Sequence, residues 1–381
     1  MSQVYGMAIK AITAYAPKDR WPNERIAARL QTEAEREDER LKGTRGYGLS
    51  DEERRQFQTN RRWLLMNTGF SERRFAAEGE GTIDLGLKAA KLLIEKTGLN
   101  PADIDRVIFG RVTPSYPYSP PDAALLQHML GIPALDGQIP REVKGLDTSL
   151  ACSTYVASLE IAYGLIRSGL SKNVLLVAAD AMGTTINWTD RAFATVLGDA
   201  GTATWLSAVH EDDDWFGPNN FWGFVDGSKA ELIITPKGGS RNPLRSYEDL
   251  ASYQHCLSMD GKAVKDIIVP LVGGPATDAA LAKVGWTLQD LQLVTLHEAN
   301  RTQLNAQILD MWRERGFAGK VIDARGEFGN TTSASVPLAK ALNPEALQPN
   351  TKFGDFVFGG GFSCSFAFGQ IRDEIITATD V

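Results

Sequence analysis

Apolar and amphipathic stretches alternate along most of the chain, which is the pattern of an α/β protein. Residues 174–179 are continuously apolar, as expected for a strand that is covered on both faces. Shortly before them, apolar residues recur at helical spacing and predict a helix that begins near Cys152 and ends at Gly169. Its apolar face is formed by Val156, Leu159, Tyr163 and Ile166.

A sequence repeat separates two similar units by nearly half the chain length. Residues 96–109 and 283–296 each follow a helical stretch, pass a glycine suited to a left-handed helix cap, and enter an apolar, strand-like run. Two helix-turn-strand units can look alike by chance, but this offset in a chain of 381 residues favours a duplicated α/β architecture. We place the two halves at 1–205 and 206–381. The matching pairs are Lys96/Lys283, Gly98/Gly285, Asp103/Asp290, Ile104/Leu291 and Val107/Val294.

One segment, residues 31–62, departs from this pattern because charged residues dominate it. Core-forming residues are few there until Trp63. We predict an inserted, solvated helical segment rather than a separate domain.

The composition is that of an ordinary globular protein, and it argues against nucleic acids and membranes as partners. With 40 basic and 47 acidic residues the formal charge is −7, which argues against a nucleic-acid partner. No continuous apolar run approaches the roughly 18 to 20 residues of a membrane span, and the first residues lack the pattern of a signal peptide. Three cysteines form no disulfide framework. We therefore expect a cytoplasmic protein that does not contact a membrane.

Cys152 is the first candidate for chemistry, because it lies between a predicted strand and a predicted helix. The positive end of a helix favours a thiolate, so we expect a lowered pKa for this thiol. Small neighbours, Ala151 and Ser153, leave room for a substrate. Most cysteines are small buried hydrophobes, however, and that alternative applies here and more strongly to Cys256 and Cys364.

His297 is the second candidate, because it directly follows the apolar run 293–296. The carboxyl end of a strand is where α/β folds place functional groups. We expect His128 and His255 to be structural. His210 begins an acidic turn, but no histidine or cysteine pair has zinc spacing, and we expect no metal.

Two small-residue turns complete the candidate set. Asn330 lies in one of them, ahead of a helix-like stretch. The other is the glycine run 359–361, which would let backbone N–H groups approach a ligand closely. It lacks the pattern of a phosphate-binding loop, and donation to an oxyanion is the better interpretation.

In combination these motifs resemble the thiolase superfamily, and specifically β-ketoacyl-acyl-carrier-protein synthase III. The resemblance runs from Met7 to Arg372, apart from the charged insertion, and implies a duplicated, five-layered α/β/α/β/α sandwich. It also implies a homodimer in which the loop 115–121 reaches the partner. The motifs are residues 147–153, 189–191, 198–201, 297–300, 329–331 and 359–362.

The resemblance also implies how the reaction proceeds. Cys152 would accept an acyl group from acyl-CoA, with the N–H groups of Cys152 and Gly360 as the oxyanion hole. His297 and Asn330 would then stabilise the enolate formed when a malonyl thioester loses carbon dioxide. The product is a β-ketoacyl thioester of fatty-acid-like or specialised polyketide synthesis, and no cofactor is required.

Donor binding is implied in the same way. Trp63 and Arg191 match a pair that sandwiches the adenine of coenzyme A, and Asn300 matches a residue of the pantetheine tunnel. An acyl carrier protein is the expected protein partner.

The chain departs from the family pattern at several positions, which indicates a specialised relative. Glu298 stands where glutamine is common, and a carboxylate beside the enolate site could change the acceptor or nearby pKa values. Asn67 stands where a basic residue often binds a phosphate of coenzyme A. The residues after Phe362 differ from the usual ones, and 326–328 are additional.

Arginines gather in sequence around Trp63. They suggest either a rim that attracts coenzyme A phosphates or an acidic carrier protein, or a solvated helix with paired charges. They are Arg54, Arg55, Arg61, Arg62, Arg73 and Arg74.

Four other functions stay open at this point. An alcohol or an amine could accept the acyl group from Cys152, or two acyl chains could be joined without decarboxylation. The order Cys-His-Asn also resembles papain-like hydrolases, although the local cysteine motif of those enzymes is absent. A non-catalytic partner subunit is disfavoured because Cys152, His297 and Asn330 are all present.

Overall fold

The structure is a computed structural model that describes residues 4–381. Its framework is two β-sheets that share one pattern of parallel and antiparallel pairing. The order of the first sheet is β17 (Ile376–Asp380), β1 (Gly6–Tyr15), β9 (Ala200–Val209), β8 (Asn173–Asp180), β4 (Arg106–Gly110) and β7 (Lys144–Thr148). The order of the second is β10 (Phe221–Val225), β16 (Ser363–Gln370), β15 (Lys352–Gly359), β13 (Leu293–Leu296) and β14 (Lys320–Ile322). From β1 and from β10 onward, each sheet has two antiparallel pairings and then two parallel ones.

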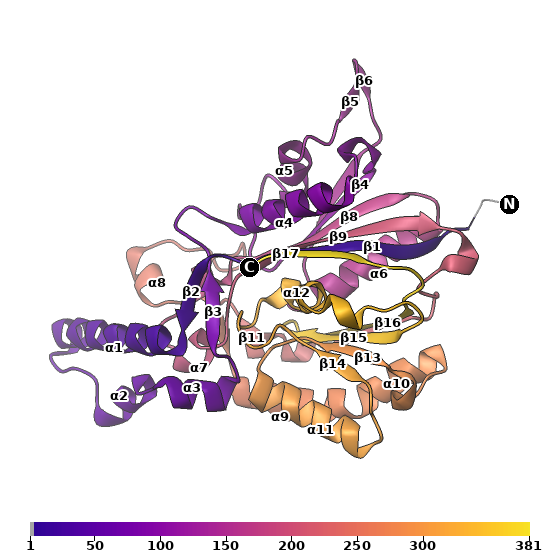
Figure 1. Ribbon diagram of the computed structural model, residues 1–381. Helices are drawn as coiled ribbons and strands as arrows, with labels where there is room; N and C mark the ends of the chain where they lie inside the picture. Colours follow the sequence, from indigo (N-terminus) through magenta and orange to yellow (C-terminus); the bar gives the residue numbers. More distant parts are fainter. Residues whose placement is uncertain (1–3) are drawn as a thin grey trace.

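Helices complete three layers around the two sheets, so the chain forms the predicted five-layered sandwich (Figure 1). Between the sheets lie α6 (Thr154–Arg167) and α12 (Ser335–Leu342), and their apolar faces join both sheets in one core. The first sheet is covered outside by α4 (Thr82–Thr97) and α5 (Asp122–Met129). The second is covered outside by α9 (Gly261–Gly273), α10 (Pro275–Val284) and α11 (Ala306–Glu314).

The repeat seen in the sequence corresponds to equivalent structural units. Gly98 closes α4 at φ +68°, and Gly285 closes α10 at φ +72°. Each glycine precedes a short 3-10 turn and then a buried strand, β4 in one half and β13 in the other. The predicted strand 174–179 is the centre of β8, and the predicted helix is α6, whose four apolar-face residues are all buried.

The halves are less separate than the predicted boundary at 205/206 suggests. That boundary falls inside β9, which continues to Val209 as part of the first sheet. The last strand, β17, pairs in parallel with β1, so the end of the chain returns to the first half.

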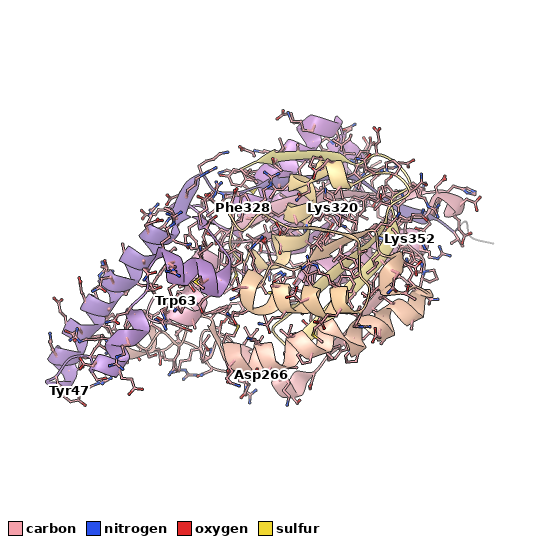
Figure 2. The ribbon with its side chains drawn as sticks, turned by 60° about the horizontal axis from the view of Figure 1, so that its bottom comes forward. Tyr47, Trp63, Asp266, Lys320, Phe328 and Lys352 are labelled. Carbon is pink, nitrogen blue, oxygen red and sulfur yellow. The ribbon has the colours of Figure 1, made fainter. Side chains whose placement is uncertain are left out.

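The charged insertion is helical as predicted, but it starts earlier than residue 31. It consists of α1 (Asn23–Arg45) and α2 (Asp51–Phe57), followed by α3 (Arg61–Thr68). Buried Ile26 and Leu30 fix α1 against the body. Beyond them the insertion projects outward, with Tyr47 at its tip and Trp63 nearer the body (Figure 2).

The remaining elements are short. A ladder of β2 (Asp19–Pro22) and β3 (Glu72–Phe75) supports the base of the insertion. The others are β5 (Leu135–Asp136), β6 (Ile139–Pro140), α7 (Arg191–Ala194), β11 (Ile233–Ile234), α8 (Tyr247–Ala251) and β12 (Ser258–Met259).

One helical stretch of the described chain, Gly261–Val284, could cross a membrane by length and composition alone. It comprises α9 and α10, which are divided at Gly274. Val264, Ile268 and Val272 from this stretch are buried in the core of the second sheet. These helices are thus outer-layer helices of the sandwich, and the absence of membrane contact stays a prediction.

A buried ion pair joins the central helix layer to the second sheet, and it gives a stability prediction. Lys340 of α12 lies 2.6 Å from Asp355 of β15, and both side chains are at most 3% exposed. We expect Lys340→Met to lower the free energy of unfolding by about 3–5 kcal/mol, because it leaves a buried carboxylate unpaired. Chemical denaturation measures this change. The matched control is Lys320→Met, whose exposed pair with Glu345 contributes about 0–1 kcal/mol. Equal losses of stability in Lys340→Met and Lys320→Met would show that the buried pair does not contribute more than the exposed one.

Candidate active site

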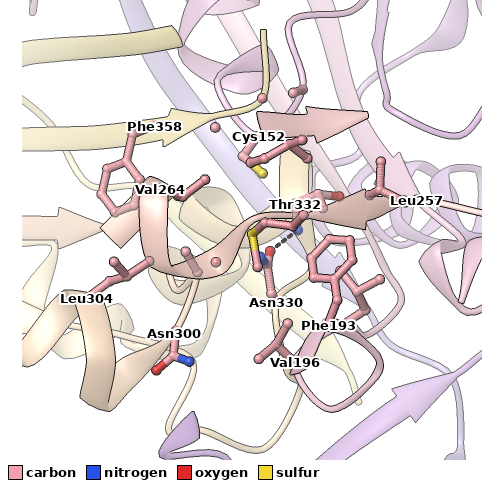
Figure 3. Close-up of a pocket in the computed structure, with 18 of the residues that line it drawn as sticks. Cys152, Phe193, Val196, Leu257, Val264, Asn300, Leu304, Asn330, Thr332 and Phe358 are labelled. Atoms are coloured by element: carbon pink, nitrogen blue, oxygen red, sulfur yellow. Dashed lines mark hydrogen bonds between the residues drawn. The ribbon is translucent and has the colours of Figure 1, made fainter. Parts of the chain in front are cut away.

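A cavity of about 730 Å³ lies where the two halves meet, and it collects almost all of the predicted site residues. Most of its wall is apolar, with Phe193, Val196 and Leu257 on one side and Val264, Leu304 and Phe358 on the other (Figure 3). The predicted site residues that line it are Cys152, His297, Asn330, Gly360, Trp63 and Asn300.

Cys152 sits on a tight turn just ahead of α6. The preceding residue, Ala151, has φ +47°, a left-handed conformation that costs a non-glycine residue energy. A methyl group on Gly359 would lie 2.8 Å from Cβ and 3.1 Å from Sγ of Cys152, so only glycine lets the end of β15 pass so close. The sulfur points toward the loop that carries Asn330 (Figure 3).

The expectation of a lowered pKa for the Cys152 thiol is wrong. Burial raises this pKa to about 12, and the negative charge of Asp180 acts in the same direction. The thiol therefore carries its proton near neutral pH. The helix N-terminus does not outweigh the loss of water around the sulfur.

His297 is fully buried at the end of β13, and neither ring nitrogen has a hydrogen-bond partner among residues 4–381. Its backbone is held on both sides, since its N–H donates to Phe356 O at 2.8 Å and its carbonyl accepts from Asn305 Nδ2 at 2.8 Å. Burial lowers the pKa of the imidazole to about 3. The ring is therefore neutral and has an N–H free to donate to a ligand.

Asn330 is oriented by its own loop. The backbone N–H of Thr332 donates to Asn330 Oδ1 at 2.9 Å, the dashed line in Figure 3. The amide oxygen is thus occupied, and Nδ2 is left as the group that can donate into the cavity.

Asp180 fixes this loop, and the sequence analysis missed it. The carboxylate is fully buried at the end of β8 and accepts from Val112 and Thr113 on one side, and from Thr332 and Ser333 on the other. Burial raises its pKa, and these hydrogen bonds oppose that change. The available signal was an acidic residue that ends a buried apolar run.

The oxyanion hole stays a prediction, and the structure shows where its two N–H groups lie. The N–H groups in question are those of Cys152 and Gly360. In the described chain, neither donates to a backbone carbonyl in the turns and loops. Gly360 lies in the turn after β15, beside Ala151. These two N–H groups are therefore free of those backbone partners and can donate to a ligand.

Glu298 does not lie beside the enolate site, so that expectation is wrong. Its carboxylate accepts from the N–H of Ala324 at 3.1 Å and pairs with Arg301, and in the described structure it does not line the cavity. Burial raises the pKa of Glu298 to about 7, while Arg301 acts in the opposite direction.

Of the three predicted donor-binding residues, Trp63 and Asn300 line the cavity. Arg191 does not line the cavity, and its Cζ lies 4.4 Å from the centroid of the Trp63 ring. The two groups are therefore in direct contact. Asn300 Nδ2 donates to Asn67 O at 3.1 Å, which links the turn after His297 to α3.

The arginine rim is wrong for two of its six members. Arg73 and Arg74 are at most 1% exposed and are therefore buried inside the protein. Arg54 pairs with Asp38 and Arg61 lies near Glu24, as the alternative of paired charges predicts.

No group of three or more metal-ligating side chains occurs among residues 4–381.

The pKa of Cys152 predicts how its reactivity depends on pH. We expect the rate of alkylation by iodoacetamide to rise about tenfold per pH unit between pH 7 and 9, because the thiolate fraction rises by that factor below the pKa. Mass spectrometry of the Cys152 peptide measures the rate, and Cys152→Ala controls for the other two cysteines. A plateau near pH 7 would contradict a raised pKa.

The pKa of Glu298 predicts a change in stability with pH. The folded protein holds this proton more tightly than the unfolded chain does, so the contribution of Glu298 to the free energy of unfolding is lost as pH rises from 4.5 to about 7. Glu298→Gln should make this loss smaller, by at most about 3 kcal/mol. Denaturation series at several pH values measure it, with exposed Glu314→Gln as control. An unchanged slope would show that Glu298 is ionised across this range.

Comparison with known proteins agrees with this geometry. Residues 146–219 match the family model for 3-oxoacyl-[acyl-carrier-protein (ACP)] synthase III, and residues 281–370 match the model for its C-terminal part. A β-ketoacyl-[acyl-carrier-protein] synthase III from Aliarcobacter butzleri is 33% identical over 82% of this chain and 91% of its own length. One from Chlamydia caviae is 34% identical over 80% of this chain and 87% of its own.

Solved structures show the same fold. A 3-oxoacyl-(acyl-carrier-protein) synthase from Burkholderia xenovorans has a TM-score of 0.78 at 26% identity, covering 99% of this chain and 97% of its own. Another synthase III structure has a TM-score of 0.77 at 27% identity, covering 96% and 99%. The chain is therefore a member of the β-ketoacyl-[acyl-carrier-protein] synthase III family, with its thiolase-type fold, and is a condensing enzyme of the ketosynthase type.

Proposed function

We propose that this enzyme takes an acyl group onto Cys152 from a thioester and condenses it with a malonyl thioester, with loss of carbon dioxide. The observation that carries this proposal is the pair of neutral donors at the cavity. The two ring nitrogens of buried His297 have no hydrogen-bond partner among residues 4–381, and Asn330 has its amide oxygen occupied, which leaves Nδ2 as its donor.

The first step is acyl transfer. The sulfur of Cys152 attacks the thioester carbonyl and gives up its proton, and the thiol of the donor leaves with a proton. The negative charge on the carbonyl oxygen develops next to the N–H groups of Cys152 and Gly360. Two donors fixed in an apolar cavity stabilise that charge without reorganising.

The second step is decarboxylation followed by carbon–carbon bond formation. The malonyl carboxylate leaves as carbon dioxide, and its electron pair forms an enolate whose oxygen accepts from His297 and Asn330. The enolate carbon then attacks the acyl carbonyl, and the Cys152 thiolate leaves and regains a proton. An apolar wall favours the neutral product, carbon dioxide, over the carboxylate.

Transfer to an alcohol or an amine is less well supported. The sequence argument for it was a carboxylate at Glu298 that could act on the acceptor. That carboxylate instead binds Ala324 and Arg301, outside the cavity wall in the described structure.

The proposed partners are an acyl carrier protein and a second copy of this chain. The names of the relatives include the carrier protein, and β7 is an edge strand of the first sheet. Large apolar side chains are exposed in the region that leads to this edge, which supports a homodimer. They are Tyr116, Tyr118, Leu135 and Ile139. A cytoplasmic location stays a prediction.

Intact-protein mass spectrometry tests this function. Acyl thioesters of several chain lengths should each be tried, and the preferred one should add its acyl mass to the wild-type protein but not to Cys152→Ala. His297→Ala and Asn330→Ala should still be acylated but lose about 10²–10³-fold in condensation with a malonyl thioester, because each removes one donor to the enolate.

The control is His128→Ala, an exposed histidine on α5, which should keep full condensation. An acyl adduct on Cys152→Ala, or full condensation by His297→Ala, would contradict the proposal. Release of an ester or an amide in place of a β-ketoacyl product would favour the alternative acceptor.

A further inference from the structure

The two N–H groups of the predicted oxyanion hole belong to turns from different halves of the chain. Cys152 lies in the turn ahead of α6, and Gly360 lies in the loop 360–362 that joins β15 to β16. Both donors must point at the same oxygen, and a displacement of about 1 Å can lower a rate about 10²-fold. The contacts that hold these two turns together therefore decide whether the donors can act as a pair.

The loop after β15 has little stiffness of its own. It is entered through three consecutive glycines, 359–361, which restrict the backbone less than any other residue does. Gly361 has φ +93°, in the left-handed region. In the described chain, the turns and loops supply no backbone N–H to the carbonyl of Gly360. The orientation of Gly360 therefore depends on side chains.

Ser363 supplies such a side chain. Its hydroxyl donates to Gly360 O at 3.1 Å. Its backbone pairs with Gly359 in the β15–β16 ladder, so the hydroxyl acts from a fixed strand. Ser363 and Gly360 are both buried, and loss of the hydroxyl would leave a buried carbonyl without a donor.

Ser153 extends this contact to the nucleophile. Its backbone N–H donates to Leu150 O at 3.0 Å, so it belongs to the turn that carries Cys152. Its Oγ lies 3.0 Å from Ser363 Oγ, although the two residues are 210 positions apart in the sequence. Each hydroxyl has one proton, so Ser363 can donate to Gly360 O while Ser153 donates to Ser363 O at 3.5 Å. The two hydroxyls thus join the turn of Cys152 to the turn of Gly360.

From these contacts we propose that Ser153 and Ser363 are positioning residues, which hold the N–H groups of Cys152 and Gly360 at the spacing that the developing oxyanion requires. The proposal rests on the proposed function, because both serines act through the oxyanion hole. Neither serine lines the cavity in the described structure. Removal of either hydroxyl should therefore slow attack on a carbonyl and leave the binding of the thioester unchanged.

Two reactions of Cys152 separate this role from a general loss of structure. Acylation places negative charge on a carbonyl oxygen, whereas alkylation by iodoacetamide displaces iodide from a saturated carbon and needs no oxyanion hole. With the thioester that the wild type prefers, we expect Ser363→Ala to lower the maximal single-turnover rate of acylation about tenfold or more. The half-saturating thioester concentration and the alkylation rate should stay within about twofold of the wild type. Ser153→Ala should show the same pattern with a several-fold loss, and mass spectrometry of the Cys152 peptide measures both reactions.

A matched pair of variants at position 363 isolates the hydroxyl from the size of the side chain. Ser363→Thr and Ser363→Val add side chains of nearly the same shape, and only threonine keeps the donor. We expect the ratio of acylation to alkylation to be within about threefold of the wild type in Ser363→Thr, and about tenfold lower in Ser363→Val. The control is Ser171→Ala, which removes a buried hydroxyl that accepts from Arg106 ahead of β8. There the ratio should not change.

Two outcomes would overturn the proposal. One is an equal ratio in Ser363→Thr and Ser363→Val, and the other is an equal loss of acylation and alkylation in Ser363→Ala and Ser153→Ala. Chemical denaturation checks that each variant is folded. If no thioester acylates the folded wild type while iodoacetamide still alkylates Cys152, the proposed function itself fails, which is distinct from both outcomes.

Discussion

A carboxylate buried where the two halves meet, that of Asp180, is the contact on which the site depends. Taking an ionised carboxylate out of water is costly, and the cost is offset only when its oxygens are fully hydrogen-bonded. Here Val112 and Thr113 donate from the first half, and Thr332 and Ser333 donate from the second. The carboxylate therefore fixes one half against the other at the position of the reactive groups.

The contact with Asp180 also orients the side-chain amide of Asn330. Thr332 has φ +48°, a conformation that a threonine adopts only when its surroundings hold it, and its hydroxyl binds Asp180. With Thr332 fixed, its N–H donates to the oxygen of Asn330 and leaves Nδ2 for a ligand. The orientation of Asn330 thus follows from a carboxylate that does not itself line the cavity in the described structure.

Local patterns in the sequence predicted much of the fold because they encode local structure. The face of α6, the buried strand β8 and the glycine caps at Gly98 and Gly285 depend on neighbouring residues. The positions of Cys152, His297 and Asn330 at element ends could be read in the same way, and the cavity brings them together. The roles proposed for these three residues come from the resemblance to a family, because their positions in the sequence do not specify them.

The predictions that were wrong concern the burial, partners and pKa values of ionisable side chains. These properties depend on residues that are distant in the sequence. Arg73 has a charge-dense sequence around it, but it is buried because Asn23 and the carbonyl of Thr195 accept from its guanidinium. Glu298 follows His297 directly, and yet it turns away to Ala324. The pKa of Cys152 likewise depends on how much of the protein surrounds the sulfur, which no sequence window records.

The protonation states of the site also distinguish a condensing enzyme from a hydrolase. A cysteine hydrolase of the papain type starts from a thiolate next to an imidazolium, two charges that stabilise each other in a solvated cleft. Here burial raises the pKa of Cys152 and lowers that of His297, so both groups are neutral before a substrate binds. In the proposed mechanism, charge then develops only during the reaction, first on the thioester oxygen and then on the enolate oxygen, next to the proposed donors. An apolar wall around Cys152 disfavours water next to an acyl group there, and in the proposed mechanism this favours attack by carbon over hydrolysis.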